Sequence, residues 1–246
     1  MEPEARYSVI EEKNLREIVL LRGSGCRYRL CTFCDYHLDF SRNQEANDRL
    51  NREILAKVSG RYGKLEVINS GSFCDLSRTT METIRETAST KGIREIHFES
   101  HWMHRAEIPA LREFFGEAGI AIKIKIGVET FDADYRERIL CKGIDETDPA
   151  VIAAAGFDEV CLLQGLTGQS ASSMTEDIET GLAHFERVCV NIMNENSTSI
   201  HPDEAVIGEF LREVYPIYQE NPRVDLLIDN LDFGVGTKVQ EKGTEE

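Results

Sequence analysis

The chain has 246 residues and a formal net charge of −16, from 28 basic and 44 acidic side chains. Hydrophobic residues make up 41% of it, enough for a buried core, and no apolar run approaches the roughly 20 residues that cross a bilayer. The charged N-terminus lacks an apolar signal segment, so we expect a cytoplasmic protein without membrane contact. The acidic balance argues against nucleic acid as a partner and favours a small-molecule ligand, weakly charged or cationic.

Short apolar runs alternate with longer helical patterns along the whole chain. Strands are expected at 17–22, 65–70, 94–99, 122–128, 159–163, 188–193 and 224–228, and helices near 45–58, 78–90, 106–117, 133–141, 149–155, 173–186 and 203–218. The core strands look uniformly apolar, which indicates burial on both faces and therefore a parallel sheet covered by helices.

This alternation predicts one α/β domain over residues 1–246, with no linker or repeat inside it. We expect a partial TIM-like (βα)6 barrel of mostly parallel strands, with its core at about 15–230 and a polar tail at 239–246. In such a fold, functional residues gather at the C-terminal ends of the strands.

Three cysteines follow the first of these strands within nine residues. Cys26, Cys31 and Cys34 have the spacing C-x4-C-x2-C. Three thiolates on one loop can hold three corners of a [4Fe-4S] cluster and leave the fourth iron open to another ligand. Zinc is the alternative, with His37 or Asp35 as fourth ligand, although structural zinc usually takes two ligand pairs. The other cysteines are expected to pack as small apolar side chains, namely Cys74, Cys141, Cys161 and Cys189.

The cysteine loop resembles the radical S-adenosylmethionine (SAM) superfamily, whose usual signature is C-x3-C-x2-C with an aromatic residue before the third cysteine. Phe33 is that aromatic residue, and one extra residue separates Cys26 from Cys31. The resemblance implies a radical SAM core, cluster ligation by Cys26, Cys31 and Cys34, SAM on the fourth iron, and Phe33 against the adenine. It also implies cleavage of SAM to a 5′-deoxyadenosyl radical, with an external electron donor such as flavodoxin or ferredoxin.

Three further strand ends offer groups for the cofactor. Ser70, Gly71 and Ser72 end the second strand, where exposed backbone groups can hold a charged ligand and where the superfamily binds the amino group of SAM. Glu129 ends the fourth strand in a Gly-Val-Glu-Thr segment that resembles the superfamily's ribose-binding stretch. Asn191, on the sixth strand, is the last candidate. A plain βα turn and a solvated loop acid remain the alternatives for the first two.

Substrate-binding candidates come from the third strand and from the chain after the last strand. Glu99 and His101 lie at the end of the third strand, beside Trp102. Asn230 and Asp232 follow the seventh strand, and their oxygens could accept hydrogen bonds from a guanine-like edge. The alternatives are ordinary packing for Trp102 and a surface position for His101.

A narrower resemblance concerns the substrate. Residues 70–75, 99–100 and 127–143 resemble the radical SAM subunit of archaeosine synthase, which acts on a 7-deazaguanine in tRNA, although His101 and Trp102 replace its Arg-Pro. The acidity and size instead resemble the queuine lyase family. This resemblance implies cleavage of a carbon–nitrogen bond in free queuine, which releases 7-aminomethyl-7-deazaguanine. A radical SAM enzyme for tRNA or another small molecule, and a zinc-stabilised binding module, stay open.

Overall fold

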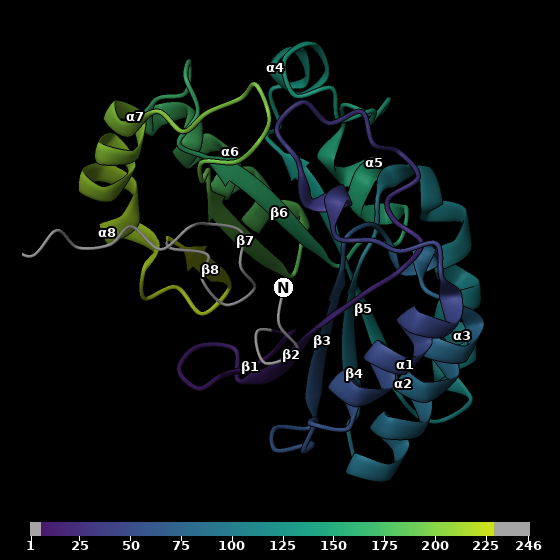
Figure 1. Ribbon diagram of the computed structural model, residues 1–246. Coiled ribbons are helices and arrows are strands. Elements are labelled where there is room, and N and C mark those ends of the chain that lie inside the picture. Colours follow the sequence, from purple (N-terminus) through teal and green to yellow (C-terminus); the bar gives the residue numbers. More distant parts are fainter. Residues whose placement is uncertain (1–5, 229–246) are drawn as a thin grey trace, which may run out of the picture.

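The computed structural model describes residues 6–228 and places eight strands in one curved sheet, in the order β1 to β8 (Figure 1). The strands are β1 (Tyr7–Ile10), β2 (Arg16–Leu21), β3 (Lys64–Asn69), β4 (Glu95–Glu99), β5 (Ala121–Glu129), β6 (Glu159–Gln164), β7 (Arg187–Ile192) and β8 (Val224–Leu227). From β2 to β8 all neighbours are parallel, and six helical connections join these seven strands. The predicted α/β partial TIM-like (βα)6 barrel is confirmed.

The antiparallel edge strand β1 was not predicted. It has four residues, all only half-buried, so its sequence lacks the apolar run that marks the other strands.

The helices cover the outer face of the sheet, with α1 to α3 beside β2–β5 and α6 to α8 beside β6–β8 (Figure 1). Their bounds are α1 (Gln44–Leu55), α2 (Arg78–Lys91), α3 (Ile108–Gly116), α4 (Ala133–Arg138), α5 (Pro149–Ala154), α6 (Ala171–His184), α7 (Glu204–Glu209) and α8 (Tyr215–Tyr218). The helix expected at 203–218 is divided by a π-helical turn at Phe210–Val214, because Pro216 cannot donate the backbone bond that an α-turn needs. Within residues 6–228, no helix combines the length and the apolar character that crossing a membrane requires.

Alternating side chains of the parallel strands serve two different environments. In β2, Val19 and Leu21 pack with Ile54 of α1 in the main apolar core, between sheet and helices. Ile18 and Leu20 point to the other face of the strand, into the interior of the half-barrel. The prediction that both faces of the parallel strands are buried is therefore confirmed.

The interior face is charged where the strands begin, which the uniformly apolar interpretation of the strands missed. Arg16 of β2 and Lys125 of β5 both pair with Glu66 of β3. Arg16 also lies 3.4 Å from Asp225 of β8, between Nη2 and Oδ2. Asp225 accepts a second bond from Asn14 Nδ2 at 2.6 Å. These contacts link β2 to β8, which are not neighbours in the sheet.

The same network continues along β6 and β7. Arg187 donates to Glu159 at 2.7 Å and to Asp225 at 2.8 Å, and His97 Nδ1 lies 2.9 Å from Glu159 Oε1. All these side chains are at least nine-tenths buried. Buried charges are tolerated only when they are paired. We call this network, of Arg16, Glu66, His97, Lys125, Glu159, Arg187 and Asp225, the barrel floor.

The barrel floor, together with Glu95, which lies 3.1 Å from His97 Nε2, predicts acid sensitivity. The hydrogen bond from His97 lowers the pKa of Glu95 to about 2. Burial raises the pKa of Glu159, but His97 and Arg187 outweigh this effect and lower the pKa to about 2. Carboxylates with a depressed pKa in the folded state stabilise it above their ordinary pKa of 4.5, and lose that contribution as the pH falls toward 2. We expect the free energy of unfolding, measured by urea titration, to fall steeply below pH 4.5. Equal stability at pH 5 and pH 3 would contradict the depressed pKa values.

Candidate functional site

A cavity of about 700 Å³ fills the half-barrel from the barrel floor up to the loop that follows β2. Four basic and four acidic side chains line it, so the surplus acid of the chain lies elsewhere. They are Arg16, Arg29, Lys125 and Lys142, and Asp35, Glu66, Glu99 and Glu129.

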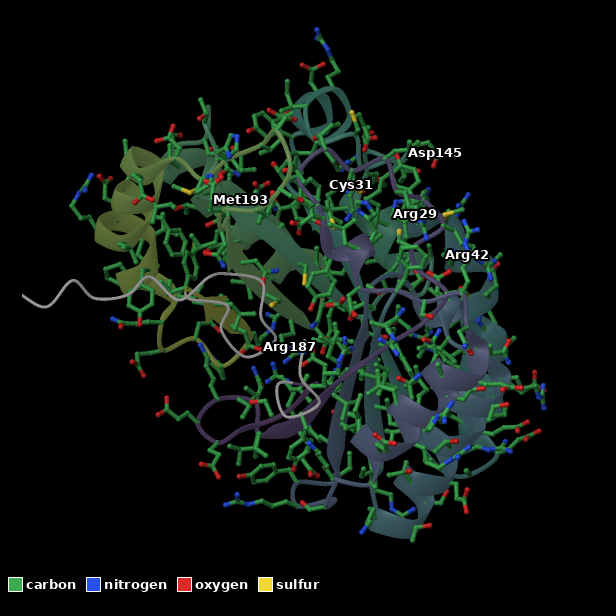
Figure 2. All side chains as sticks on the ribbon, viewed as in Figure 1. Arg29, Cys31, Arg42, Asp145, Arg187 and Met193 are labelled. Carbon is green, nitrogen blue, oxygen red and sulfur yellow. The ribbon has the colours of Figure 1, made fainter. Side chains whose placement is uncertain are left out.

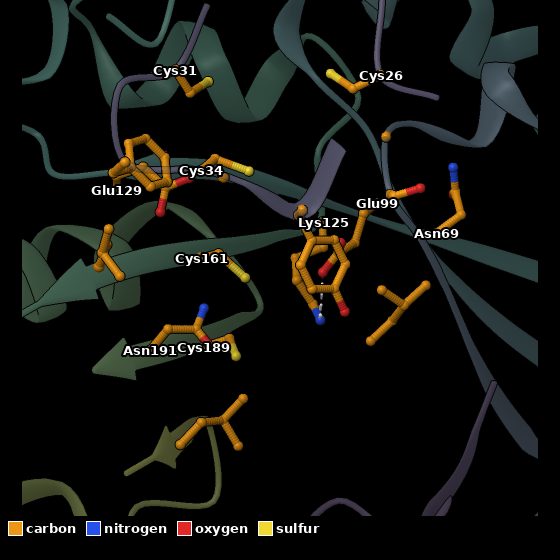
Figure 3. Close-up of a pocket in the computed structure, with 18 of the residues that line it drawn as sticks. Cys26, Cys31, Cys34, Asn69, Glu99, Lys125, Glu129, Cys161, Cys189 and Asn191 are labelled. Carbon is orange, nitrogen blue, oxygen red and sulfur yellow. Dashed lines mark ion pairs between the residues drawn. The ribbon is translucent and has the colours of Figure 1, made fainter. Parts of the chain in front are cut away.

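The three cysteines of the loop after β2 lie together at one end of this cavity (Figure 3). The loop is fixed by neighbouring strand ends, since Cys26 N donates to Ser70 O at 3.0 Å and Thr32 N to Leu140 O at 3.1 Å. Asn196, beyond β7, donates to Phe33 O at 2.8 Å. Contacts from three separate segments, after β3, α4 and β7, therefore hold the thiols toward one space. In Figure 2, Cys31 and Arg29 are labelled at this end of the molecule, and Arg187, which belongs to the barrel floor, is labelled far from them.

The three thiols are not gathered as closely as the ligands of a single zinc ion would be. Ligand atoms around a tetrahedral zinc lie about 3.8 Å apart, given Zn–S bonds of about 2.3 Å. Within residues 6–228, one set of three ligand atoms lies within 4.8 Å of one another, and it is Cys74, His104 and Glu107, outside the cavity. Asp35, a candidate fourth zinc ligand, accepts two hydrogen bonds from Ser197 instead.

Burial raises the pKa of Cys31 to about 12, against the opposing charge of Lys142, and it also raises that of Cys34. Thiolates at this depth therefore require the positive charge of bound metal. The residues present fit a [4Fe-4S] cluster held by Cys26, Cys31 and Cys34.

The end of β3 forms a tight cradle beside the cysteine loop. A Cβ on Gly71 would lie 2.4 Å from Asp75 Oδ2 and 3.0 Å from Cys26 Cα, so only glycine allows this approach. Ser70 and Ser72 flank it, and Ser72 Oγ accepts from His101 N at 2.9 Å. All three predicted residues line the cavity.

Asn69 was missed by the sequence analysis, although it directly precedes this segment. Its side chain is 1% exposed and lines the cavity, and its Oδ1 has no hydrogen-bond partner among the described residues. Because a buried carbonyl without a partner is costly, this oxygen is suited to accept from a ligand ammonium group.

Glu129 is turned into the cavity by a bulge in β5. The register with β6 shifts between Gly127 and Glu129, and Glu129 has a left-handed φ of 71°. Its Oε1 accepts from Lys142 Nζ at 2.7 Å, and Nζ lies 5.5 Å from the Phe33 ring centre. Lys142 was not among the predicted site residues. The pair holds a carboxylate beside Phe33, where a ribose-binding role for Glu129 remains a prediction.

Gly127 makes room for this pair, because a Cβ there would lie 2.4 Å from Glu129 Oε1 and 2.9 Å from Lys142 Nζ. Gly127→Ala is expected to displace both flexible side-chain ends without unfolding the protein, and to weaken SAM binding about tenfold, or about 1.4 kcal/mol. Equilibrium binding of SAM to the reconstituted protein measures this. Gly116→Ala is the control, since its Cβ would meet nothing within 4 Å. Unchanged SAM affinity in Gly127→Ala would show that the Glu129–Lys142 pair does not contribute to SAM binding.

Glu99 and Lys125 lie deeper in the cavity, with their ion pair drawn in Figure 3. Lys125 Nζ is 3.6 Å from Glu99 and also pairs with Glu66. The Glu99 side chain is 32% exposed, and that exposure is to the cavity that it lines. Burial raises the pKa of Glu99, and the charge of Lys125 opposes it. Lys125, missed from sequence because it lies inside an apolar strand, places a cation beside the predicted acid.

His101 also lines the cavity, but both of its ring nitrogens contact the protein. Nδ1 accepts from Met103 N at 3.2 Å, so Nε2 donates to Lys142 O at 2.7 Å. Burial and then Lys142 lower its pKa to about 4, which keeps the ring neutral. It stacks on Tyr28 of the cysteine loop at 4.2 Å. A substrate role for His101 stays a prediction, while Trp102 is buried against Phe157.

The remaining candidates fall into two groups. Asn191 of β7 lines the cavity, and its cofactor role stays a prediction. Asn230 and Asp232 lie outside the described residues. Cys161 and Cys189 are buried, as expected for small apolar residues, and they also line the cavity, which the sequence analysis missed. Their alternation with outward-facing residues in β6 and β7 was the signal available in the sequence.

No protein-family model and no curated protein matches the chain. Among solved structures, the queuine lyase from Clostridium spiroforme bound to SAM and queuine is 40% identical, with a TM-score of 0.87, covering 94% of this chain and 99% of that one. Two further solved structures share the fold. Streptococcus suis SuiB is 13% identical, with a TM-score of 0.52, covering 84% of this chain and 48% of that one. Methylornithine synthase PylB is 14% identical, with a TM-score of 0.52, covering 85% of this chain and 70% of that one.

Proposed function

The chain belongs to the queuine lyase family, and we propose that it is a radical SAM lyase that cleaves free queuine to 7-aminomethyl-7-deazaguanine. One observation carries the proposal. A cavity of about 700 Å³ has three thiols at one end and a lysine–glutamate pair deep inside, in a chain that matches queuine lyase over 94% of its length.

The cysteine end of the cavity is the proposed cofactor site. Cys26, Cys31 and Cys34 would hold the [4Fe-4S] cluster, which with SAM supplies the hydrogen-abstracting radical. Asn69 Oδ1 and the backbone around Gly71 would accept hydrogen bonds from the SAM ammonium group. Phe33 would lie against the adenine, and Glu129, held by Lys142, would accept hydrogen bonds from the ribose. These groups orient SAM before any chemistry.

The deep end is the proposed substrate site. A 7-deazaguanine presents N–H donors and a carbonyl oxygen on adjacent positions of one edge. Glu99 can accept from those donors, and Lys125 can donate to that oxygen. Glu66 and Glu99 both lie beside the Lys125 ammonium group, so its position is fixed from two sides. The apolar lining above it, including Ile68 and Leu227, excludes water from the base.

We also propose a single-domain cytoplasmic enzyme that takes electrons from an external donor such as flavodoxin or ferredoxin. All seven cysteines are free thiols, which suits a reducing compartment. The acid surplus outside the cavity supports a free base rather than tRNA as the substrate.

The test uses anaerobic, reconstituted full-length protein with SAM, dithionite and either queuine or queuosine-containing tRNA. Mass spectrometry measures 5′-deoxyadenosine and the released 7-deazaguanine. We expect both products with free queuine. Deoxyadenosine without a queuine-derived product would overturn the substrate, and modification of the tRNA alone would favour the tRNA-acting alternative.

Glu99→Gln tests the deep site. The amide keeps the size of the side chain but loses the charge and one acceptor face toward the base N–H groups. A hydrogen bond to a charged group contributes about 1.5–3 kcal/mol, so kcat/KM for queuine should fall roughly 10- to 100-fold. Glu113→Gln, on the exposed side of α3, is the matched control. Equal kcat/KM in wild type and Glu99→Gln would exclude Glu99 from substrate binding.

A further inference from the structure

Two cysteines that the proposed site does not use lie side by side on the cavity wall. Cys161 of β6 and Cys189 of β7 are direct register partners in the parallel sheet, and both line the cavity. Their exposed fractions are 7% and 4%. Figure 3 shows both side chains pointing into the space below the cluster cysteines, on the wall opposite Asn69 and Glu99. Cys161, Cys189, Lys125 and the cluster cysteines all line the same cavity.

The surroundings favour Cys161 as the more accessible of the two. Its register partner on β5 is Gly127, which has no side chain of its own, and Glu129 Oε1 and Lys142 Nζ lie over this glycine. On its other side the thiol is hydrogen-bonded to Cys189. That bond and then burial raise the pKa of Cys161 well above its usual range, so it keeps its hydrogen at neutral pH. A protonated thiol without a metal partner therefore lies on the cavity wall.

Radical cleavage of a carbon–nitrogen bond ends in a step that such a group can perform. Abstraction of one hydrogen atom from the substrate and scission of the bond leave an unpaired electron on one of the two fragments. A closed-shell product forms when that fragment gains a hydrogen atom, or an electron and a proton. A thiol S–H bond is weaker than the N–H bonds and the serine O–H bonds lining the cavity, and it is comparable to the phenol O–H bond of Tyr36, which also lines it. Thiols are therefore among the groups here that give up a hydrogen atom most readily.

We propose that Cys161 donates this hydrogen atom and that Cys189 positions it. This inference rests on the proposed lyase function. The Cys161 S–H bond breaks, an N–H or C–H bond forms on the fragment, and a thiyl radical remains on Cys161. One electron from the low-potential one-electron reductant that the reaction already requires, with one proton from solvent, restores the thiol. The three cluster cysteines cannot serve, because their sulfurs bind iron.

The experiment follows solvent deuterium. Reconstituted full-length wild type, Cys161→Ser and Cys189→Ser are equilibrated in D2O and then given SAM, queuine and dithionite. In wild type, we expect one deuterium to be delivered to a carbon or nitrogen atom of a fragment. Mass spectrometry detects it where the new bond does not exchange with solvent. We also expect about one cleaved queuine per 5′-deoxyadenosine. Serine keeps the shape, but its O–H bond is too strong to donate. Cys161→Ser should still form deoxyadenosine, with at least about tenfold less cleaved queuine per deoxyadenosine.

A second measurement separates chemistry from folding. Binding of queuine to each variant, with S-adenosylhomocysteine in place of SAM, should be unchanged if the thiol acts only as a donor. Cys189→Ser should show a smaller loss of coupling than Cys161→Ser. If Cys189→Ser shows the larger loss, the assignment within the pair is wrong.

The outcomes also distinguish this inference from the proposed function. If wild type forms deoxyadenosine but cleaves no queuine, the substrate is wrong and the donor role falls with it. If wild type cleaves queuine and Cys161→Ser cleaves it with the same coupling and the same deuterium content, the lyase function stands and the donor role is overturned.

Discussion

Cys31→Ala is expected to abolish SAM cleavage, by at least about a thousandfold, because the cluster loses one of its three protein ligands. The fold should survive, since the loop is held by backbone bonds such as Cys26 N to Ser70 O and Thr32 N to Leu140 O. Iron content, visible absorption and 5′-deoxyadenosine formation measure the loss. Thermal unfolding of the cluster-free proteins measures the fold.

The control for this variant is Cys141→Ala, since Cys141 does not line the cavity and contributes its backbone carbonyl to Tyr28. It should keep iron and SAM cleavage. The zinc alternative makes the opposite prediction for Cys31→Ala, namely loss of zinc with strong destabilisation. Bound zinc in place of iron in wild type would end the radical SAM interpretation.

Arg187→Met is expected to be strongly destabilising. Arg187 neutralises both Glu159 and Asp225 in the barrel floor, at 2.7 Å and 2.8 Å. Its side chain is 8% exposed, so its removal leaves two buried carboxylates without their main cation. Breaking a buried ion pair in this way costs about 3–5 kcal/mol. Urea titration at pH 7 measures the free energy of unfolding.

Arg78→Met is the control, because Arg78 is 81% exposed and its pair with Glu82 contributes little. The double variant Arg187→Met with Glu159→Gln should recover part of the loss, since one of the two unpaired charges is then removed. Wild-type stability of Arg187→Met would show that water or neighbouring cations already compensate the two acids.

Much of the fold follows from local sequence. Each of the seven parallel strands contains a short stretch of apolar and β-branched residues, which is typical of a buried strand. The cysteine loop is similarly local, since Cys26, Cys31 and Cys34 lie within nine residues. Gly71 and Glu129 could be placed at strand ends because parallel strands present their C-terminal ends at one edge of the sheet.

The sequence by itself therefore determined the half-barrel, the cysteine loop and the end of the barrel at which the site lies. The tertiary structure alone decided which interior side chains meet. Lys125 with Glu99 and Glu66, Lys142 with Glu129, and Cys161 beside Cys189 come from strands and loops separated by 13 to 59 residues. The physical reason is the two-residue period of a strand. A single charged or thiol side chain in an apolar strand faces solvent, helix or barrel interior according to register and curvature, and these are set only when the whole sheet is assembled.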